Sequence, residues 1–93
     1  MKRSGSASLA TAIANAQLEH RRLIVLQVLE ETTSSNDSVL ESVLSMVGHL
    51  VTRDMMLTDL AWLEEQALVS TTVVNASLTV VTITERGVDV ALG

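Results

Sequence analysis

Apolar and polar residues follow one another along the chain in blocks that predict five helical segments and one hairpin. The first block is alanine-rich and carries Leu9, Ile13, Ala16 and His20 at helical spacing. A second block, residues 23–29, is hydrophobic on almost every side, so a helix there needs cover on several faces. We expect that cover to come from the first helix, from the rest of the domain or from a second copy of the chain.

The middle of the chain has the signals of two helices joined by a short turn. Residues 32–37 are polar and predict a loop, and Ser38 with Glu41 forms the S-x-x-E pattern of a helix-capping box. Gly48 lies where a left-handed residue commonly ends a helix. Thr52 is a good cap for the helix that follows.

The helix after Thr52 has two different faces. At 100° per residue, one side gathers the large apolar residues that should form its core face: Met56, Leu57, Leu60 and Leu63. The opposite side carries residues that would meet a partner: Met55, Thr58, Trp62 and Glu65, flanked by Asp54, Asp59 and Gln66.

Beyond residue 68 the period changes from helical to strand-like. Residues 69–74 and 78–84 are rich in β-branched side chains and flank a short turn at 75–77, which predicts an uncharged β-hairpin. Thr79, Val81 and Ile83 should share one face of it. The residues after Thr84 predict a short final helix that returns three apolar side chains to the core: Val88, Ala91 and Leu92.

This order of elements predicts a mainly α fold with a β-hairpin, a winged helix-turn-helix with an extra N-terminal helix. We assign residues 7–93 to that single domain and residues 1–6 to a disordered tail. A chain of 93 residues suffices for one modest core.

Two stretches resemble the winged helix-turn-helix superfamily. GHLVTRDMMLTDLAWLEEQALV, residues 48–69, resembles its helix of the form D-L-x-x-L-E-x-x-G-L-V, and ITERG, residues 83–87, resembles the T-x-x-G after its hairpin. HRRLIVLQVLEE, together with the same helix, is similar to small proteins of Mu-like bacteriophages and prophages that are often labelled arsenical-repressor-like. The resemblance covers residues 18–93 and departs from the pattern at Ala67, where the superfamily has glycine.

The resemblance implies a phage or prophage transcription regulator that binds double-stranded DNA. It also implies a homodimer through the N-terminal helices, in the cytoplasm of a bacterial host cell. If DNA is bound, we expect Arg53 and Thr58 to contact the groove and Arg21 and Arg22 to contact phosphates.

Charge argues against this function. Six basic and eleven acidic residues give a net charge of −5, whereas DNA-binding domains typically have a basic face. The alternative is a winged-helix scaffold for protein–protein contact without DNA binding, whose interface candidates are Met55, Trp62, Leu9 and Ile13. Trp62 would otherwise lie under the hairpin or the C-terminal segment.

Other chemistry has little support in the sequence. His20 and His49 are the only nitrogen ligands, show no ligand spacing and have no cysteine beside them, so we expect no metal and no cofactor. The chain has no nucleophile-elbow motif and no glycine-rich phosphate loop, which argues against an enzyme. We infer no small-molecule ligand, and we expect neither a signal peptide nor a membrane span.

Overall fold

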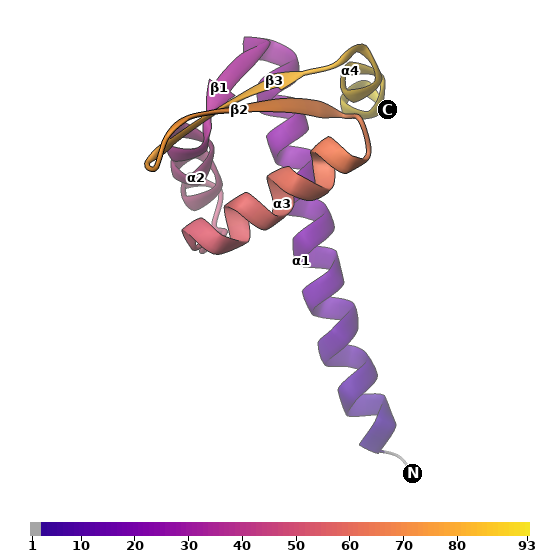
Figure 1. Ribbon diagram of the computed structural model, residues 1–93. Helices are drawn as coiled ribbons and strands as arrows, with labels where there is room; N and C mark the ends of the chain where they lie inside the picture. Colours follow the sequence, from indigo (N-terminus) through magenta and orange to yellow (C-terminus); the bar gives the residue numbers. More distant parts are fainter. Residues whose placement is uncertain (1–2) are drawn as a thin grey trace.

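Helix α1 (Arg3–Thr32) runs along the body of the molecule and projects far beyond it (Figure 1). The computed structural model describes the backbone of residues 3–93 and the side chains from Ser8 onward. A helix of 30 residues is about 45 Å long, close to the longest dimension of the molecule, 49 Å. Of the expected disordered tail, residues 1–2 lie outside the described residues, and residues 3–6 belong to α1.

The prediction of two separate helices before residue 32 is wrong, because α1 is continuous. The alanine-rich block and residues 23–29 are joined by residues that favour helix, with no proline or glycine between them. The cover for residues 23–29 comes mainly from the rest of the domain: Val25, Leu26 and Leu29 are buried, while Leu23 stays 38% exposed.

The remaining elements form a winged helix-turn-helix, as predicted. They are β1 (Ser34–Asn36), α2 (Asp37–Met46), α3 (Arg53–Glu65), β2 (Val69–Asn75), β3 (Leu78–Ile83) and α4 (Glu85–Leu92). The three strands form an antiparallel sheet in the order β1-β3-β2. Strand β1 lies in the stretch that was expected to be a loop; it is short and polar, and its pairing with β3 rather than its own side chains makes it a strand.

Local signals explain most helix ends. Thr52 accepts a hydrogen bond from the backbone N–H of Met55, and Gly48 has a φ of +94° after α2, both as expected. The expected capping box at Ser38 is wrong. Asn36 caps α2 instead, because its side chain accepts a hydrogen bond of 3.0 Å from the backbone N–H of Val39.

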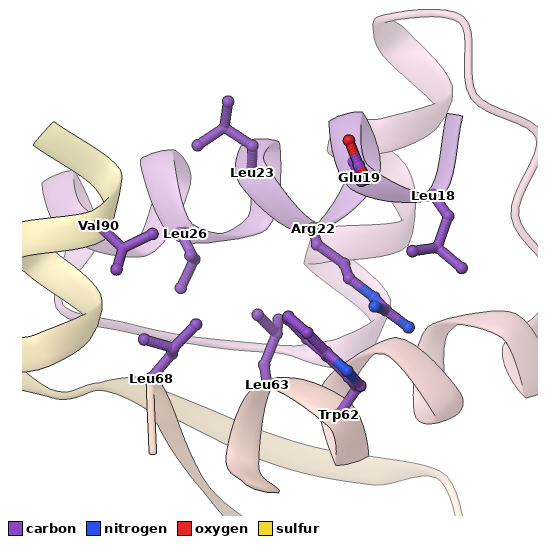
Figure 2. Close-up of a pocket in the computed structure, with 9 residues that line it drawn as sticks. All are labelled: Leu18, Glu19, Arg22, Leu23, Leu26, Trp62, Leu63, Leu68 and Val90. Carbon is purple, nitrogen blue, oxygen red and sulfur yellow. The ribbon is translucent and has the colours of Figure 1, made fainter. Parts of the chain in front are cut away.

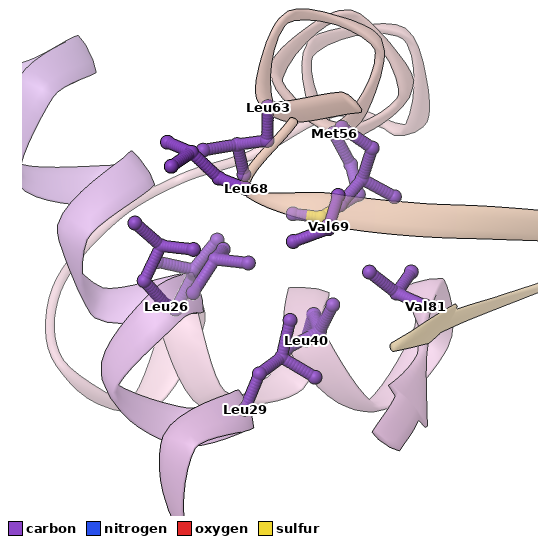
Figure 3. Close-up of a cluster of buried hydrophobic side chains, with 11 residues drawn as sticks. Leu26, Leu29, Leu40, Met56, Leu63, Leu68, Val69 and Val81 are labelled. Atoms are coloured by element: carbon purple, nitrogen blue, oxygen red, sulfur yellow. The ribbon is translucent and has the colours of Figure 1, made fainter. Parts of the chain in front are cut away.

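The core is aliphatic and draws on every layer of the fold (Figure 3). Its buried members are Val25, Leu26, Leu29, Leu40, Leu44, Met56, Leu60, Leu63, Leu68, Val69 and Val81. In the hairpin, Thr79 and Val81 are buried on one face, as the alternation predicts. Leu92 does not return to the core, since it is 68% exposed. Ala91 does pack against the core.

Helix α3 turns a different face to the core from the one expected. Met56, Leu60 and Leu63 are buried as predicted, but Leu57 is 36% exposed and Asp59 is 1% exposed. The helix is therefore rotated so that Asp59 takes the inward position that hydrophobicity alone assigns to Leu57. The reason is ionic, because Asp59 pairs with two arginines of α1.

The junction between α3 and β2 explains the T-x-x-G motif. Ala67 is left-handed, with a φ of +60°, and the hydroxyl of Thr84 donates a hydrogen bond of 2.7 Å to its carbonyl. Gly87 is buried against Leu68, whose carbonyl oxygen a Cβ would hit. The glycine is thus required for α4 to pack close to this turn.

Candidate functional site

The outer surface of α3, beside the hairpin, is left uncovered by the described chain (Figure 1). Asp54, Leu57, Thr58 and Ala61 are exposed there, and Met55 is half-buried. In a helix-turn-helix this is the helix that enters the major groove, chiefly by its N-terminal half. Thr58 is exposed on the outer face of α3, as the sequence predicts, and its contact with the groove stays a prediction.

Arg53, at the start of α3, is held by the protein itself. Its Nη1 lies 2.8 Å from Oδ2 of Asp37 and 3.9 Å from Oε2 of Glu41. Its Nη2 donates a hydrogen bond of 3.3 Å to the carbonyl of Ala76 at the hairpin tip. The guanidinium thus joins α2, α3 and the hairpin, and its side chain is 38% exposed.

Asp37 is the reason for this arrangement. Its side chain is fully buried at 0% exposure, and its Oδ1 accepts hydrogen bonds from the backbone N–H groups of Ser38 and Thr79. Its Oδ2 has no hydrogen-bond donor among the described residues and only the ion pair with Arg53 to balance it. A buried carboxylate needs such a counter-ion, so the position of Arg53 is structural.

Arg21 and Arg22 share one carboxylate. Arg21 donates to both oxygens of Asp59, at 2.7 Å and 3.2 Å, and Arg22 donates from Nε to Oδ1 at 3.3 Å. The Arg21 residue is only 9% exposed. Both guanidinium groups therefore join α1 to α3, and phosphate contact by Arg21 and Arg22 stays a prediction.

Trp62 lies against Arg22 rather than under the hairpin or the C-terminal segment. The guanidinium carbon of Arg22 is 4.1 Å from the centre of its ring, a cation–π contact. Trp62 stays 38% exposed. It remains a candidate interface residue, with Leu9 at 62% and Ile13 at 51% exposure on the projecting part of α1.

The last arginine with a described side chain is also engaged. Arg86 donates from Nε to the carbonyl of Gln66, 3.0 Å away. Within the part of the chain whose side chains are described, each arginine therefore has an internal acceptor. No sequence motif predicts these arginine–acceptor pairs, because most of the partners lie far apart along the chain.

The two histidines meet at the side of α1. Nδ1 of His20 lies 2.8 Å from Nε2 of His49, so one ring donates a hydrogen bond to the other. Partial burial, with His20 and Arg21 nearby, lowers the pKa of His49. The sequence predicts a surface His20 and a His49 in a turn, and both lie there, but not that they touch.

Metal and membrane sites have no support in the described residues. No cluster of three or more histidine, aspartate or glutamate side chains suitable for a metal ion occurs among them. No helix in the same part of the chain is long and apolar enough to cross a membrane.

Relatives found by sequence decide the family. The chain is 44% identical over 77 residues to the uncharacterized protein gp26 of Escherichia phage Mu, a match that covers 81% of this chain and 78% of gp26. The chain belongs to the family of phage Mu gp26. Another relative, an uncharacterized protein of Haemophilus influenzae strain Rd, is 38% identical over 69 residues, which is 73% of this chain and 68% of that protein. No protein-family model matches the chain.

Solved structures agree with the winged helix-turn-helix fold of this gp26 relative. The transcriptional regulator homologue protein from Pyrococcus horikoshii OT3 has a TM-score of 0.63 and 27% identity, over 76% of this chain and 68% of that one. HlyU from Vibrio cholerae N16961 has a TM-score of 0.62 and 23% identity, over 99% and 92% of the two chains. The predicted resemblance to the superfamily and to Mu-like phage proteins is confirmed. The arsenical-repressor subtype stays a prediction.

Proposed function

We propose that the protein is a phage or prophage transcription regulator that binds double-stranded DNA as a homodimer. The observation that carries the proposal is the exposed N-terminal half of α3 in a winged helix-turn-helix, with Thr58 on its open side. The likeness to a transcriptional regulator homologue supports it. A regulator of phage genes would act in the cytoplasm of the bacterial host.

The contact at Arg53 supports a preformed reading surface. By joining Asp37 and the carbonyl of Ala76, this side chain fixes the tip of the hairpin relative to the start of α3. A surface that is rigid before it meets DNA loses less entropy on binding. Arg53 thus serves the proposed function through geometry, with its partly exposed guanidinium at the edge of the contact.

The homodimer is proposed through the N-terminal half of α1. The described residues from 8 to 17 are all exposed, and none of them is charged. An isolated helical stretch of this length is marginally stable in water. Pairing along Leu9 and Ile13 with a second copy would cover its apolar residues and bring two α3 helices into one assembly.

Protein–protein contact without DNA binding is the second candidate, and a specific observation favours it. The end of α2 and the turn that follows it present apolar side chains, with Met46 83% and Leu50 90% exposed. A turn that lies on a sugar–phosphate backbone normally offers donors or cations there. The net charge of −5 points in the same direction.

Binding to a mixed-sequence duplex at low salt tests the proposal. Thr58→Glu places a carboxylate on the exposed half of α3, and we expect it to weaken binding at least tenfold. Gln66→Glu adds the same charge at the far end of the helix and should leave binding within about twofold of the parent protein. Equal affinities for the two variants would argue that α3 does not lie in the groove.

A further inference from the structure

A shallow apolar groove lies between α1, the end of α3 and α4 (Figure 2). Its volume is about 290 Å³, at the lower end of the range for small-molecule sites. The apolar wall is formed by Leu18, Leu23, Leu26, Trp62, Leu68 and Val90. Among the residues whose side chains are described, Arg22 is the one cation that lines it.

Two arginines and one aspartate pair beside the groove, and their charges do not cancel. Arg21 and Arg22 both donate to Asp59, and that carboxylate is 1% exposed. Arginine keeps its proton at every physiological pH, so two cations face one anion. These three side chains alone carry a net charge of +1, while Glu19, which also lines the groove, carries a negative charge. The attraction for an additional anion is therefore local to the guanidinium of Arg22.

Arg22 is oriented to receive that anion. Its Nε is engaged by Asp59 and its flat face by Trp62. Its two Nη atoms have no hydrogen-bond partner among the residues that the structure describes. Glu19 also borders the groove, but no ion pair joins it to Arg22 in the described chain. The free edge of the guanidinium has the geometry that a carboxylate recognises.

We propose that this groove binds a small organic acid with an apolar body and one carboxylate. The carboxylate accepts hydrogen bonds from the Nη atoms of Arg22, and the apolar body lies along the leucines, Trp62 and Val90. The ligand pairs with Arg22 and covers the exposed parts of Leu23 and Trp62, which are each 38% exposed. This site does not depend on DNA binding.

Titration with octanoate, and with octan-1-ol as its neutral counterpart, tests the proposal on the full chain. Trp62 is the only tryptophan, so its fluorescence reports on the groove directly. We expect a saturable change with octanoate and an affinity at least about tenfold weaker for octan-1-ol, since a hydrogen bond to a charged group contributes about 1.5–3 kcal/mol. No saturable change, or equal affinities for the two compounds, would overturn the proposal.

Variants keep the test specific. Arg22→Gln should remove the preference for octanoate, as measured by equilibrium dialysis, because Trp62 fluorescence itself changes when its neighbour is replaced. Leu23→Glu, at a partly exposed position, should block octanoate while the fold is kept. Arg86→Gln removes a cation outside the groove and should leave the octanoate affinity unchanged. Unaltered octanoate affinity in Arg22→Gln would contradict the role of the guanidinium.

Discussion

The buried carboxylate of Asp37 fixes the position of Arg53 at the start of α3. Asp37 holds the backbone of β3 with one oxygen and faces Arg53 with the other. Removing Arg53 therefore does two things at once: it deletes a candidate DNA contact and leaves a buried negative charge without a counter-ion. Loss of DNA binding in an Arg53 variant would say little by itself.

We expect Arg53→Ala to lower the free energy of unfolding by up to about 3 kcal/mol, because the buried carboxylate of Asp37 loses its partly exposed counter-ion. Urea unfolding measures the change. The double variant Arg53→Ala/Asp37→Asn removes the unpaired charge and keeps an oxygen for the N–H of Thr79, so it should regain most of the loss. An Arg53→Ala protein as stable as the parent would refute the structural role of this pair.

The histidine pair predicts a dependence of stability on pH. The pKa of His49 in the folded protein is below its ordinary value of 6.5, so the unfolded chain binds more protons as pH falls. Stability from this group is therefore complete above pH 6.5 and decreases below it. We expect the melting temperature to fall between pH 7.5 and pH 5.5, and to fall less in His49→Gln. The same decline in both proteins would exclude His49 as its cause.

Residue-scale contacts are what the sequence predicts least well. Arg21 and Asp59 are 38 positions apart, and nothing in the spacing of either residue indicates the other. The helical step placed Asp59 beside the outer face of α3, and Arg21 was predicted to contact phosphates. Only the packing of α1 against α3 brings them together, so their role in the interior could not be read from the pattern.

At the scale of elements, the α3–β2 junction tolerates a residue that its backbone disfavours. Ala67 is left-handed, with a φ of +60°, and the surrounding hydrogen bonds from Thr84 and Arg86 hold the turn in that shape. Glycine adopts this conformation without a steric cost.

We expect Ala67→Gly to raise the free energy of unfolding by about 1 kcal/mol, the cost of a left-handed alanine. Ala61→Gly is the matched control, since Ala61 is exposed inside α3, and it should lower stability by about 0.5–1 kcal/mol. The midpoints of urea unfolding show whether each variant is more or less stable than the parent protein. A decrease in both variants would show that the junction is not strained.

Elements with local signals were predictable. The period of the hairpin and the caps at Thr52 and Thr84 depend on neighbouring residues only, and the structure has them where the sequence indicates. Strand β1 was missed because its pairing partner, β3, lies more than forty residues away. The rotation of α3 was missed because it depends on the arginines of α1.

At the scale of the whole molecule, α1 extends well past the body that it stabilises (Figure 1). Among the residues whose side chains are described, its buried positions begin at Arg21, and residues 8–17 are all exposed. We therefore expect a chain that lacks residues 1–17 to stay folded but to lose the proposed homodimer.

Sedimentation velocity of the full and shortened chains measures this. The full chain should sediment as a dimer and the shortened chain as a monomer. Ile13→Glu in the full chain should also give a monomer, because Ile13 is 51% exposed on the projecting helix. A full chain that is monomeric at micromolar concentration would contradict the proposed homodimer.

The charge of the whole molecule limits how DNA can be bound. The four arginines with described side chains all have internal acceptors, so few phosphate contacts remain for each chain. Affinity should then depend weakly on salt, because each neutralised phosphate contributes about −0.9 to the slope of log affinity against log salt.

The most direct test is the affinity of the full chain for duplex DNA, by fluorescence anisotropy, over a series of salt concentrations beginning at about 50 mM. If the protein binds DNA, we expect measurable binding at the lowest salt. With this charge pattern, the slope of log affinity against log salt should be shallower than about −4. No binding at the lowest salt would contradict the proposed regulator and leave protein–protein contact as the function of the fold.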